Sequence, residues 1–226
     1  MLNMARDTQY SASHFVEVAG VDQKRWNRMP SPELLERTLR EIERRAMKAV
    51  LAENGDEALA LVRKMIPKGS TVMSGSSTTL TEIGFENYVA EEEHGWVSIR
   101  ERVFAEDDEK RRNELRRHSI TADYFLSSAN AVAATGEIVA CDASGSRVGA
   151  WPYGAGRLII VVGANKIVPT LHDALERVRQ YAYPLENARS LRAYGTPSMI
   201  GKCVILAGER NPDRTTVIIV REALGY

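Results

Sequence analysis

The sequence has few cysteines, no net charge and no long apolar run. Among its 226 residues, Cys141 and Cys203 are the two cysteines, and they form no CxxC motif. A chain of this length can bury a core without disulfides, and a reduced, cytoplasmic setting is expected. Lysine and arginine total 30, as do aspartate and glutamate, which argues against a mainly nucleic-acid-binding role. No apolar run approaches the roughly 18 residues that span a bilayer, so membrane insertion is not expected.

The apolar pattern divides the chain into a short arm and one α/β domain. Residues 1–30 are mixed and aperiodic, and they are predicted to lie on the surface or against a partner. Residues 31–226 are predicted to form the domain. It begins with a helix at Ser31-Pro32-Glu33, where a capping serine precedes proline. Apolar residues recur at helical spacing as far as Val50, and Asn54-Gly55 ends this helix.

Short apolar runs alternate with helical patterns through the rest of the chain. The continuous apolar run within Arg157–Val162 is typical of a parallel strand that is covered on both faces. Residues 137–142 and 147–151 flank Ala143-Ser-Gly-Ser146, which predicts a hairpin with a turn near Gly145. The fold class is therefore predicted as α/β, with an open, mostly parallel sheet flanked by helices and an inserted antiparallel hairpin.

A loop of small residues follows the predicted strand that begins at Thr71. Backbone N–H groups at the start of a following helix attract phosphate or carboxylate, and hydroxyl side chains add donors. The loop lacks the lysine of a P-loop and the GxGxxG spacing of dinucleotide folds, so an ordinary capped turn is the alternative. The predicted anion-binding residues of this loop are Ser74, Gly75, Ser76, Ser77, Thr78 and Thr79.

Further anion-binding candidates stand at other predicted strand ends. Arg147 can bind an anionic substrate, or it can form a local ion pair with Asp142. Lys166 and its neighbour Asn165 follow a predicted strand, and the lysine can neutralise a phosphate or carboxylate; the alternative is an exposed turn lysine. Loops at strand ends gather on one edge of open α/β sheets. These residues and the Ser74–Thr79 loop are therefore predicted to share one cleft.

An ordered series of motifs resembles the LUD-domain family, also known as lactate-utilisation proteins. The upstream match consists of Ser76-Ser77-Thr78-Thr79 and Glu82-Ile83-Gly84. No single motif is specific to the family, but the number and order of the motifs make the resemblance specific. The downstream match consists of Ala122-Asp123, Asn130-Ala131-Val132, Gly136-Glu137-Ile138-Val139, Asp142, Gly145, Arg147-Val148, Val161-Val-Gly-Ala-Asn-Lys-Ile-Val168, Glu176-Arg-Val-Arg179 and Glu222-Ala-Leu-Gly-Tyr226.

The resemblance implies the fold of the sugar-phosphate isomerases and CoA transferases, the NagB/RpiA/CoA-transferase group. Related CoA transferases use a glutamate as nucleophile and related isomerases use carboxylates as bases, so Glu137 is the predicted catalytic residue. The alternative for Glu137 is an exposed strand residue. Many short family members carry a cysteine-rich segment, of which only Cys203 remains here. One thiolate cannot hold a zinc ion or a cluster, so neither a metal nor another cofactor is predicted.

Two functions remain open from the sequence. The first is an enzyme that acts on a small anionic metabolite by isomerase- or transferase-type chemistry. Its substrate would be a phosphorylated sugar, a hydroxy acid or an acyl-CoA compound. The second is a non-catalytic accessory protein in the utilisation of lactate or a related carboxylate, which binds redox subunits. A homodimer is also predicted, because the arm carries Phe15, Trp26 and Met29 and twofold assemblies are common.

Overall fold

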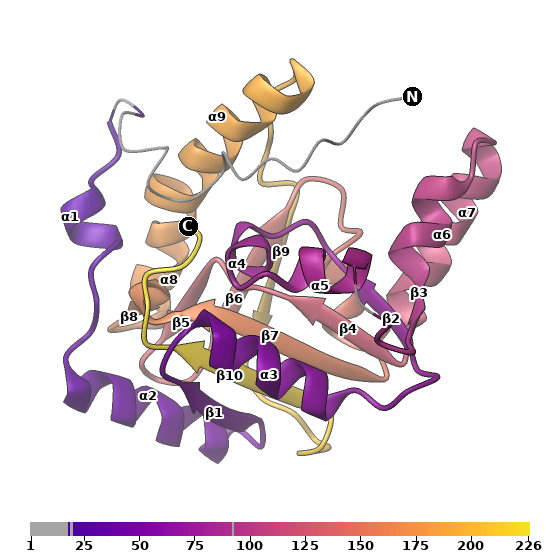
Figure 1. Cartoon of the computed structure of the whole chain (residues 1–226). Helices are drawn as coiled ribbons and strands as arrows, with labels where there is room; N and C mark the ends of the chain where they lie inside the picture. Colours follow the sequence, from indigo (N-terminus) through magenta and orange to yellow (C-terminus); the bar gives the residue numbers. More distant parts are fainter. Residues whose placement is uncertain (1–17, 19, 92) are drawn as a thin grey trace.

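The computed structural model of the chain describes residues 18, 20–91 and 93–226 (Figure 1). Its centre is an open, 6-stranded sheet in which all neighbouring strands are parallel. The predicted α/β fold with a mostly parallel sheet is confirmed. In sheet order, the strands are β1 (Lys48–Ala52), β10 (Thr215–Val220), β7 (Arg157–Gly163), β4 (Tyr124–Ser127), β2 (Thr71–Ser74) and β3 (Val97–Ser98).

Two hydrophobic clusters cover the two faces of this sheet, because successive strand residues point to opposite faces. Along β7, Leu158, Ile160 and Val162 belong to one cluster, whereas Ile159 and Val161 belong to the other. Burial on both faces explains why a continuous apolar run forms this strand. The first cluster includes residues of α2 (Pro32–Arg44), and the second includes residues of α3 (Gly55–Met65), α4 (Thr78–Glu82) and α5 (Phe85–Glu91).

A second, 4-stranded sheet shares the first of these clusters. One of its faces contributes Ile138 and Ala140 to that cluster. On its other face, Val139 and Cys141 pack with residues of α8 (Leu171–Arg177) and α9 (Tyr183–Tyr194). In sheet order, its strands are β8 (Ile167–Val168), β5 (Ala131–Ala133), β6 (Ile138–Asp142) and β9 (Lys202–Leu206).

The predicted hairpin over residues 137–151 is wrong. Its first arm exists as β6, but the antiparallel partners of β6 are β5 and β9. Residues 148–150 form a 3₁₀ turn in place of a returning strand. The chain turns after β6 because the Asp142 carboxylate accepts hydrogen bonds from three backbone N–H groups, those of Gly145, Arg147 and Val148.

The first helix ends earlier than its apolar spacing predicts. α2 stops at Arg44, and Ala46 takes a left-handed conformation with a φ of 55°, which turns the chain. Residues Lys48–Ala52 then pair with β10 as strand β1. A short apolar run suits a helix as well as a strand, so pairing with a buried neighbour decides its conformation.

The described part of the N-terminal segment packs against its own domain. α1 (Gln23–Trp26) places the Trp26 side chain in the cluster that contains residues of α8. The Trp26 carbonyl oxygen accepts a hydrogen bond from Arg177 Nε at 3.0 Å. Phe15 lies outside the described residues. Trp26 therefore gives no support to a dimer interface, and the homodimer stays a prediction.

Two further helices, α6 (Ile99–Ala105) and α7 (Glu109–His118), stand beside the β3 edge of the sheet (Figure 1). α7 has an acid in its first turn and bases in its last, and it buries no residue. This order of charges is the one that the helix dipole favours. Among the described residues, no helix combines the length and the apolar character that crossing a membrane requires.

Gly136, in the tight turn between β5 and β6, is expected to tolerate no side chain. Its φ is +95°, and a Cβ atom there would lie 2.6 Å from the Glu41 carbonyl oxygen. We expect Gly136→Ala to lower the free energy of unfolding by about 3–4 kcal/mol in chemical denaturation. Gly69→Ala is the matched control, because Gly69 also has a positive φ but a Cβ atom there meets nothing within 4 Å. The control should cost about 1–2 kcal/mol; equal costs would contradict the close packing of this turn.

Candidate functional site

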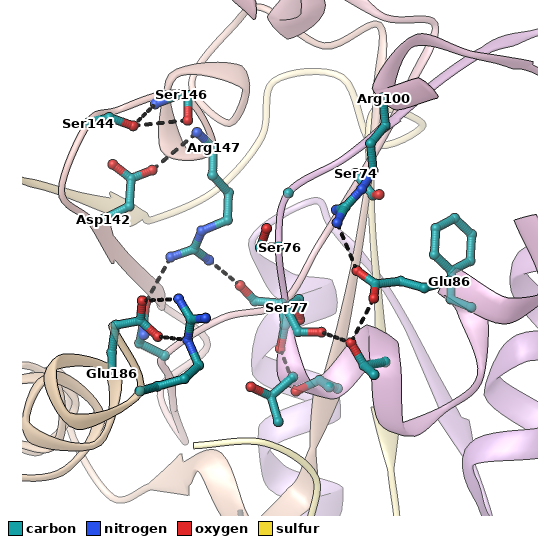
Figure 2. Close-up of a pocket in the computed structure, with 18 of the residues that line it drawn as sticks. Ser74, Ser76, Ser77, Glu86, Arg100, Asp142, Ser144, Ser146, Arg147 and Glu186 are labelled. Atoms are coloured by element: carbon teal, nitrogen blue, oxygen red, sulfur yellow. Dashed lines mark hydrogen bonds and ion pairs between the residues drawn. The ribbon is translucent and has the colours of Figure 1, made fainter. Parts of the chain in front are cut away.

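A cavity of about 1070 Å³ opens at the carboxyl ends of β2 and β4. Ser74 ends β2 and Ser128 follows β4, and both line the cavity. Another part of the wall comes from Asp142 at the end of β6 and from Glu186 on α9 (Figure 2). Open parallel sheets bind ligands at this edge, and the volume is near the upper end for small-molecule sites.

The Ser74–Thr79 loop contributes all of its residues to the cavity wall. Ser77 caps α4, and its Oγ accepts a backbone N–H of the first turn at 3.3 Å. The Gly75 N–H donates to the Leu126 carbonyl oxygen at 3.3 Å, so this amide belongs to the sheet. A Cβ atom on Gly75 would lie 2.9 Å from Cδ of Arg147. Glycine therefore lets the loop approach the arginine stem.

Arg147 organises the wall that faces this loop. Its guanidinium donates to the carbonyl oxygens of Ser128, at 2.6 Å, and Cys141, and to Oδ1 of Asn130 at 3.2 Å. The Asp142 carboxylate accepts the backbone N–H of Arg147, and the alternative of an ion pair between their side chains is not found in the described structure. Burial lowers the pKa of Arg147, but an arginine stays charged at neutral pH.

Lys166 reaches the cavity from a buried position and is only 2% exposed. Its Nζ donates to Thr79 Oγ1 at 2.9 Å, to Ser128 Oγ at 3.2 Å and to the Ala129 carbonyl oxygen at 3.1 Å. The three donors of an ammonium group are thus satisfied. The alternative of an exposed turn lysine is wrong.

Positive charge gathers around Lys166. Burial lowers the pKa of Lys166 well below the ordinary lysine range; Arg177 and Arg147 also lower it, while Glu82 raises it. Burial lowers the pKa of Arg177 as well, to about 10. Within the described part of the chain, neither Arg147 nor Lys166 forms an ion pair with a carboxylate. A ligand anion would therefore meet positive charge that nearby carboxylates such as Glu82 offset in part but do not pair with directly.

Two ion pairs of the wall are absent from the sequence predictions. On α9, Arg189 donates to both carboxylate oxygens of Glu186 at 2.8 and 2.7 Å, and the Tyr226 hydroxyl donates to Glu186 at 2.6 Å. Elsewhere in the wall, Arg100 pairs with Glu86 at 3.3 Å (Figure 2). The i, i+3 spacing on a helix was the signal for the first pair. The second joins α5 to α6 and has no local signal.

Asn165 does not line the cavity, unlike the adjacent Lys166. Its Nδ2 donates to Asn27 Oδ1 at 2.6 Å and to the Gly225 carbonyl oxygen at 3.2 Å, while its Oδ1 accepts the Leu224 N–H at 3.1 Å. The side chain therefore ties residues near both ends of the chain to the core. The structure gives Asn165 this role in place of the predicted contact with an anion.

Glu137 lies at the opposite end of β6 from the cavity. β6 runs from Ile138 to Asp142, and its residue Cys141 lines the cavity. About four residues, or roughly 13 Å of strand, therefore separate Glu137 from this part of the wall. Its carboxylate pairs with Arg45 and accepts the Thr135 hydroxyl. The predicted convergence of Glu137 with the Ser74–Thr79 loop is wrong, and the structure gives no support to catalysis by this carboxylate.

Glu137→Gln is expected to change stability and not ligand binding. The substitution leaves the partly buried Arg45 without its counter-ion, so the free energy of unfolding should fall by about 1–3 kcal/mol in chemical denaturation. Arg45→Gln should cost a similar amount, and the double variant should lose less than the sum of the two. A Glu137→Gln protein with unchanged stability and no ligand binding would be inconsistent with this role.

No group of three or more His, Cys, Asp or Glu side chains that could hold a metal ion occurs among the described residues. Function without a metal or other cofactor stays a prediction from the sequence.

Comparison with known proteins agrees with this fold. The structure is similar to the crystal structure of a DUF162 family protein from Deinococcus radiodurans. The TM-score is 0.53 at 16% identity, over 85% of this chain and 99% of that chain. No curated protein matches the sequence. The family model of the LUD domain matches residues 35–220. Because this match spans most of the sequence, the chain belongs to the LUD domain family.

Proposed function

We propose that this protein binds a small anionic metabolite between the Ser74–Thr79 loop, Arg147 and Lys166. The candidates are a phosphorylated sugar, a hydroxy acid or an acyl-CoA compound. The observation that carries the proposal is the buried Lys166 on the cavity wall, which has no ion-pair partner among the described residues. Burying a cation without a counter-ion is costly, and a bound anion would supply the missing charge.

The two cations differ in what they offer a ligand. The Arg147 guanidinium donates hydrogen bonds to three oxygens of the wall, so it supplies a positive charge in a fixed position. The Lys166 ammonium is held by two hydroxyls and one carbonyl oxygen. A phosphate or carboxylate oxygen forms a stronger hydrogen bond with an ammonium than a hydroxyl does, so it can take the place of one of these contacts.

The geometry supports binding more strongly than CoA-transferase chemistry. Such transfer needs a carboxylate nucleophile. Of the four carboxylates of the cavity wall, Glu86, Asp142 and Glu186 already accept hydrogen bonds or ion pairs from protein groups. The fourth, Glu101, is exposed on α6. The lowered pKa of Lys166 makes its amine the better candidate for a base. Isomerase-type proton transfer would therefore use Lys166.

A second candidate function is the accessory role in carboxylate utilisation, without turnover. It is favoured by four exposed apolar side chains on and after α9, three of which stand at the cavity wall and which a partner would cover. A redox subunit should then co-purify with the protein. A second copy of the chain is the alternative partner for these side chains. Light scattering of the protein alone would then show a mass above the 25.1 kDa monomer. These side chains are Leu191, Tyr194, Met199 and Ile200.

The proposal is tested by thermal unfolding in the presence of matched ligands. The anions are L-lactate, ribose 5-phosphate and acetyl-CoA, and the neutral controls for the first two are lactamide and ribose at the same ionic strength. At least one anion should raise Tm, because ligand binding stabilises the native state, while its neutral counterpart should not. Equal shifts for anions and neutral controls would contradict anion binding. Consumption of a stabilising ligand would separate the enzyme from the accessory protein.

Anion affinity is expected to fall as pH rises, within a range below the ordinary lysine pKa of about 10.4. Lys166 attracts an anion only while its amine is protonated. Because its pKa is lowered, Lys166 loses this proton at a lower pH than an ordinary lysine does. A bound anion favours the charged form and raises the pKa, so binding should take up protons. Calorimetric titrations at several pH values check this, with Lys166→Met as the control that should lose the pH dependence. An affinity that rises with pH would contradict it.

A further inference from the structure

Cys141 and Cys203 face each other across two antiparallel strands, although they are far apart in the sequence. The register of β6 and β9 places Cys141 opposite Cys203, and both are free cysteines. Opposite residues of an antiparallel pair point to the same face of the sheet. The proposed anion site uses neither thiol, so the pair raises a separate question.

The hydrogen bonds around β6 show which kind of antiparallel pair these cysteines form. The Cys141 N–H donates to Asn130 Oδ1 at 2.8 Å, and the Cys141 carbonyl oxygen accepts a hydrogen bond from the Arg147 guanidinium. Both groups thus have partners outside β9. The next carbonyl, of Asp142, accepts the Gly201 N–H at 3.1 Å on the β9 side. Cys141 and Cys203 are therefore a non-hydrogen-bonded pair, the type in which Cα atoms lie about 4.5 Å apart and side chains are closest.

This arrangement fits the geometry of a disulfide, whose Cα atoms are about 4.4–6.8 Å apart. Cys203 is exposed on the edge strand β9, whereas Cys141 is buried. Burial, together with a hydrogen bond between the two thiols, raises the pKa of Cys141. Cys203 is therefore the sulfur that a reagent from solvent meets first, and Cys141 is the sulfur placed to attack it afterwards.

We propose that Cys141 and Cys203 form a dithiol site that low-molecular-mass disulfides oxidise to a cross-strand disulfide. The Cys203 thiolate attacks one sulfur of the small disulfide, which gives a mixed disulfide and releases one thiolate. The Cys141 thiolate then attacks the Cys203 sulfur, which forms the protein disulfide and releases the second thiolate. The released thiolates take up the two protons lost by the protein thiols. The protein dithiol is oxidised by two electrons, and the small disulfide is reduced to two thiols.

The bond would join the cavity wall to the edge of the second sheet. Cys141 lines the cavity, and so do Met199 and Ile200 in the segment that leads into β9. Exposed cross-links are the labile ones, so a dithiol reagent should reverse the oxidation. The site does not depend on anion binding, and each proposal can fail without the other.

The test incubates the reduced full chain, freed of reductant, with oxidised glutathione and then alkylates the remaining thiols. Peptide mass spectrometry should show a linked peptide pair that contains Cys141 and Cys203, with the loss of two hydrogen atoms and no alkylation at either position. Dithiothreitol should restore both alkylation sites. Non-reducing electrophoresis should show a single chain, because the bond is intramolecular.

Two variants separate the steps of the exchange. In Cys141→Ser, the glutathione adduct on Cys203 should persist, because the resolving thiol is gone. In Cys203→Ser, the buried Cys141 should stay free of glutathione. Three results with the native chain would each overturn the proposal. The first is a glutathione adduct that persists on Cys203, and the second is a disulfide between two chains. The third is that both thiols stay free after oxidised glutathione is added, although alkylation shows that Cys203 is accessible.

Discussion

Lys166→Met is expected to weaken binding of the best anionic ligand by about 10- to 100-fold, since a hydrogen bond to a charged group contributes about 1.5–3 kcal/mol. Methionine retains the unbranched apolar shape of the lysine stem but not its charge. The free energy of unfolding at neutral pH should change by no more than about 1–2 kcal/mol, because relief of the buried charge offsets the loss of a donor to Thr79, Ser128 and the Ala129 carbonyl oxygen. A substitution that removes binding without lowering stability is the mark of a group retained for function.

The sign of this stability effect follows from the lowered pKa of Lys166. The folded protein binds the Lys166 proton less tightly than the unfolded chain does, so the charged form opposes folding. This cost is present at pH values below the folded pKa. It is relieved as pH rises from the folded pKa to the ordinary lysine pKa. The stability of the native chain relative to Lys166→Met should therefore increase with pH over that interval.

Calorimetric titration and chemical denaturation measure the two effects of Lys166→Met. Lys64→Met is the matched control, because Lys64 is exposed on α3, and it should change neither quantity by much. If Lys166→Met bound the ligand as tightly as the native chain, Lys166 would not be part of the site. If it lost several kcal/mol of stability, its role would be structural.

Arg147→Met is expected to abolish detectable anion binding and also to lower the free energy of unfolding by about 2–4 kcal/mol. The guanidinium holds the carbonyl oxygens of Ser128 and Cys141 and the Asn130 side chain. Each acceptor left without a partner costs about 1–3 kcal/mol. Loss of these contacts also loosens the wall against which the Ser74–Thr79 loop packs. The substitution thus removes the positive charge of the guanidinium and also disturbs the position of the cavity wall.

Arg147→Lys separates these two contributions. It keeps a positive charge but cannot hold several oxygens with a planar fork, so it should recover some affinity and little stability. Chemical denaturation and titration of the two variants with the same anion provide the comparison. Full affinity in Arg147→Met would remove Arg147 from the proposed site.

The sheet could be predicted from the sequence where a strand is apolar on both faces, and less well where it is not. The run in β7 was recognisable because it is continuously apolar, as a strand buried on both faces requires. β1 was missed because its short apolar run also suits a helix. The hairpin over residues 137–151 failed for a different reason. The Asp142 carboxylate binds the backbone after β6, and β9 comes from much later in the chain.

The candidate site shows the same division. The rule that strand-end loops share one edge placed the Ser74–Thr79 loop near Lys166, and the structure brings both to one cavity. The rule did not apply to Glu137, which precedes a strand of the second, mixed sheet. Its partner Arg45 follows α2, and no local spacing connects the two.

The central claim is tested most directly by a crystal structure of the protein grown with the anion that gives the largest thermal shift. We expect density for the anion inside the cavity, with a carboxylate or phosphate oxygen within hydrogen-bonding distance of Lys166 Nζ, about 2.7–3.2 Å. The ligand should lie between the Ser74–Thr79 loop and Arg147. Density for the anion at another surface, with the cavity filled by water, would contradict the account.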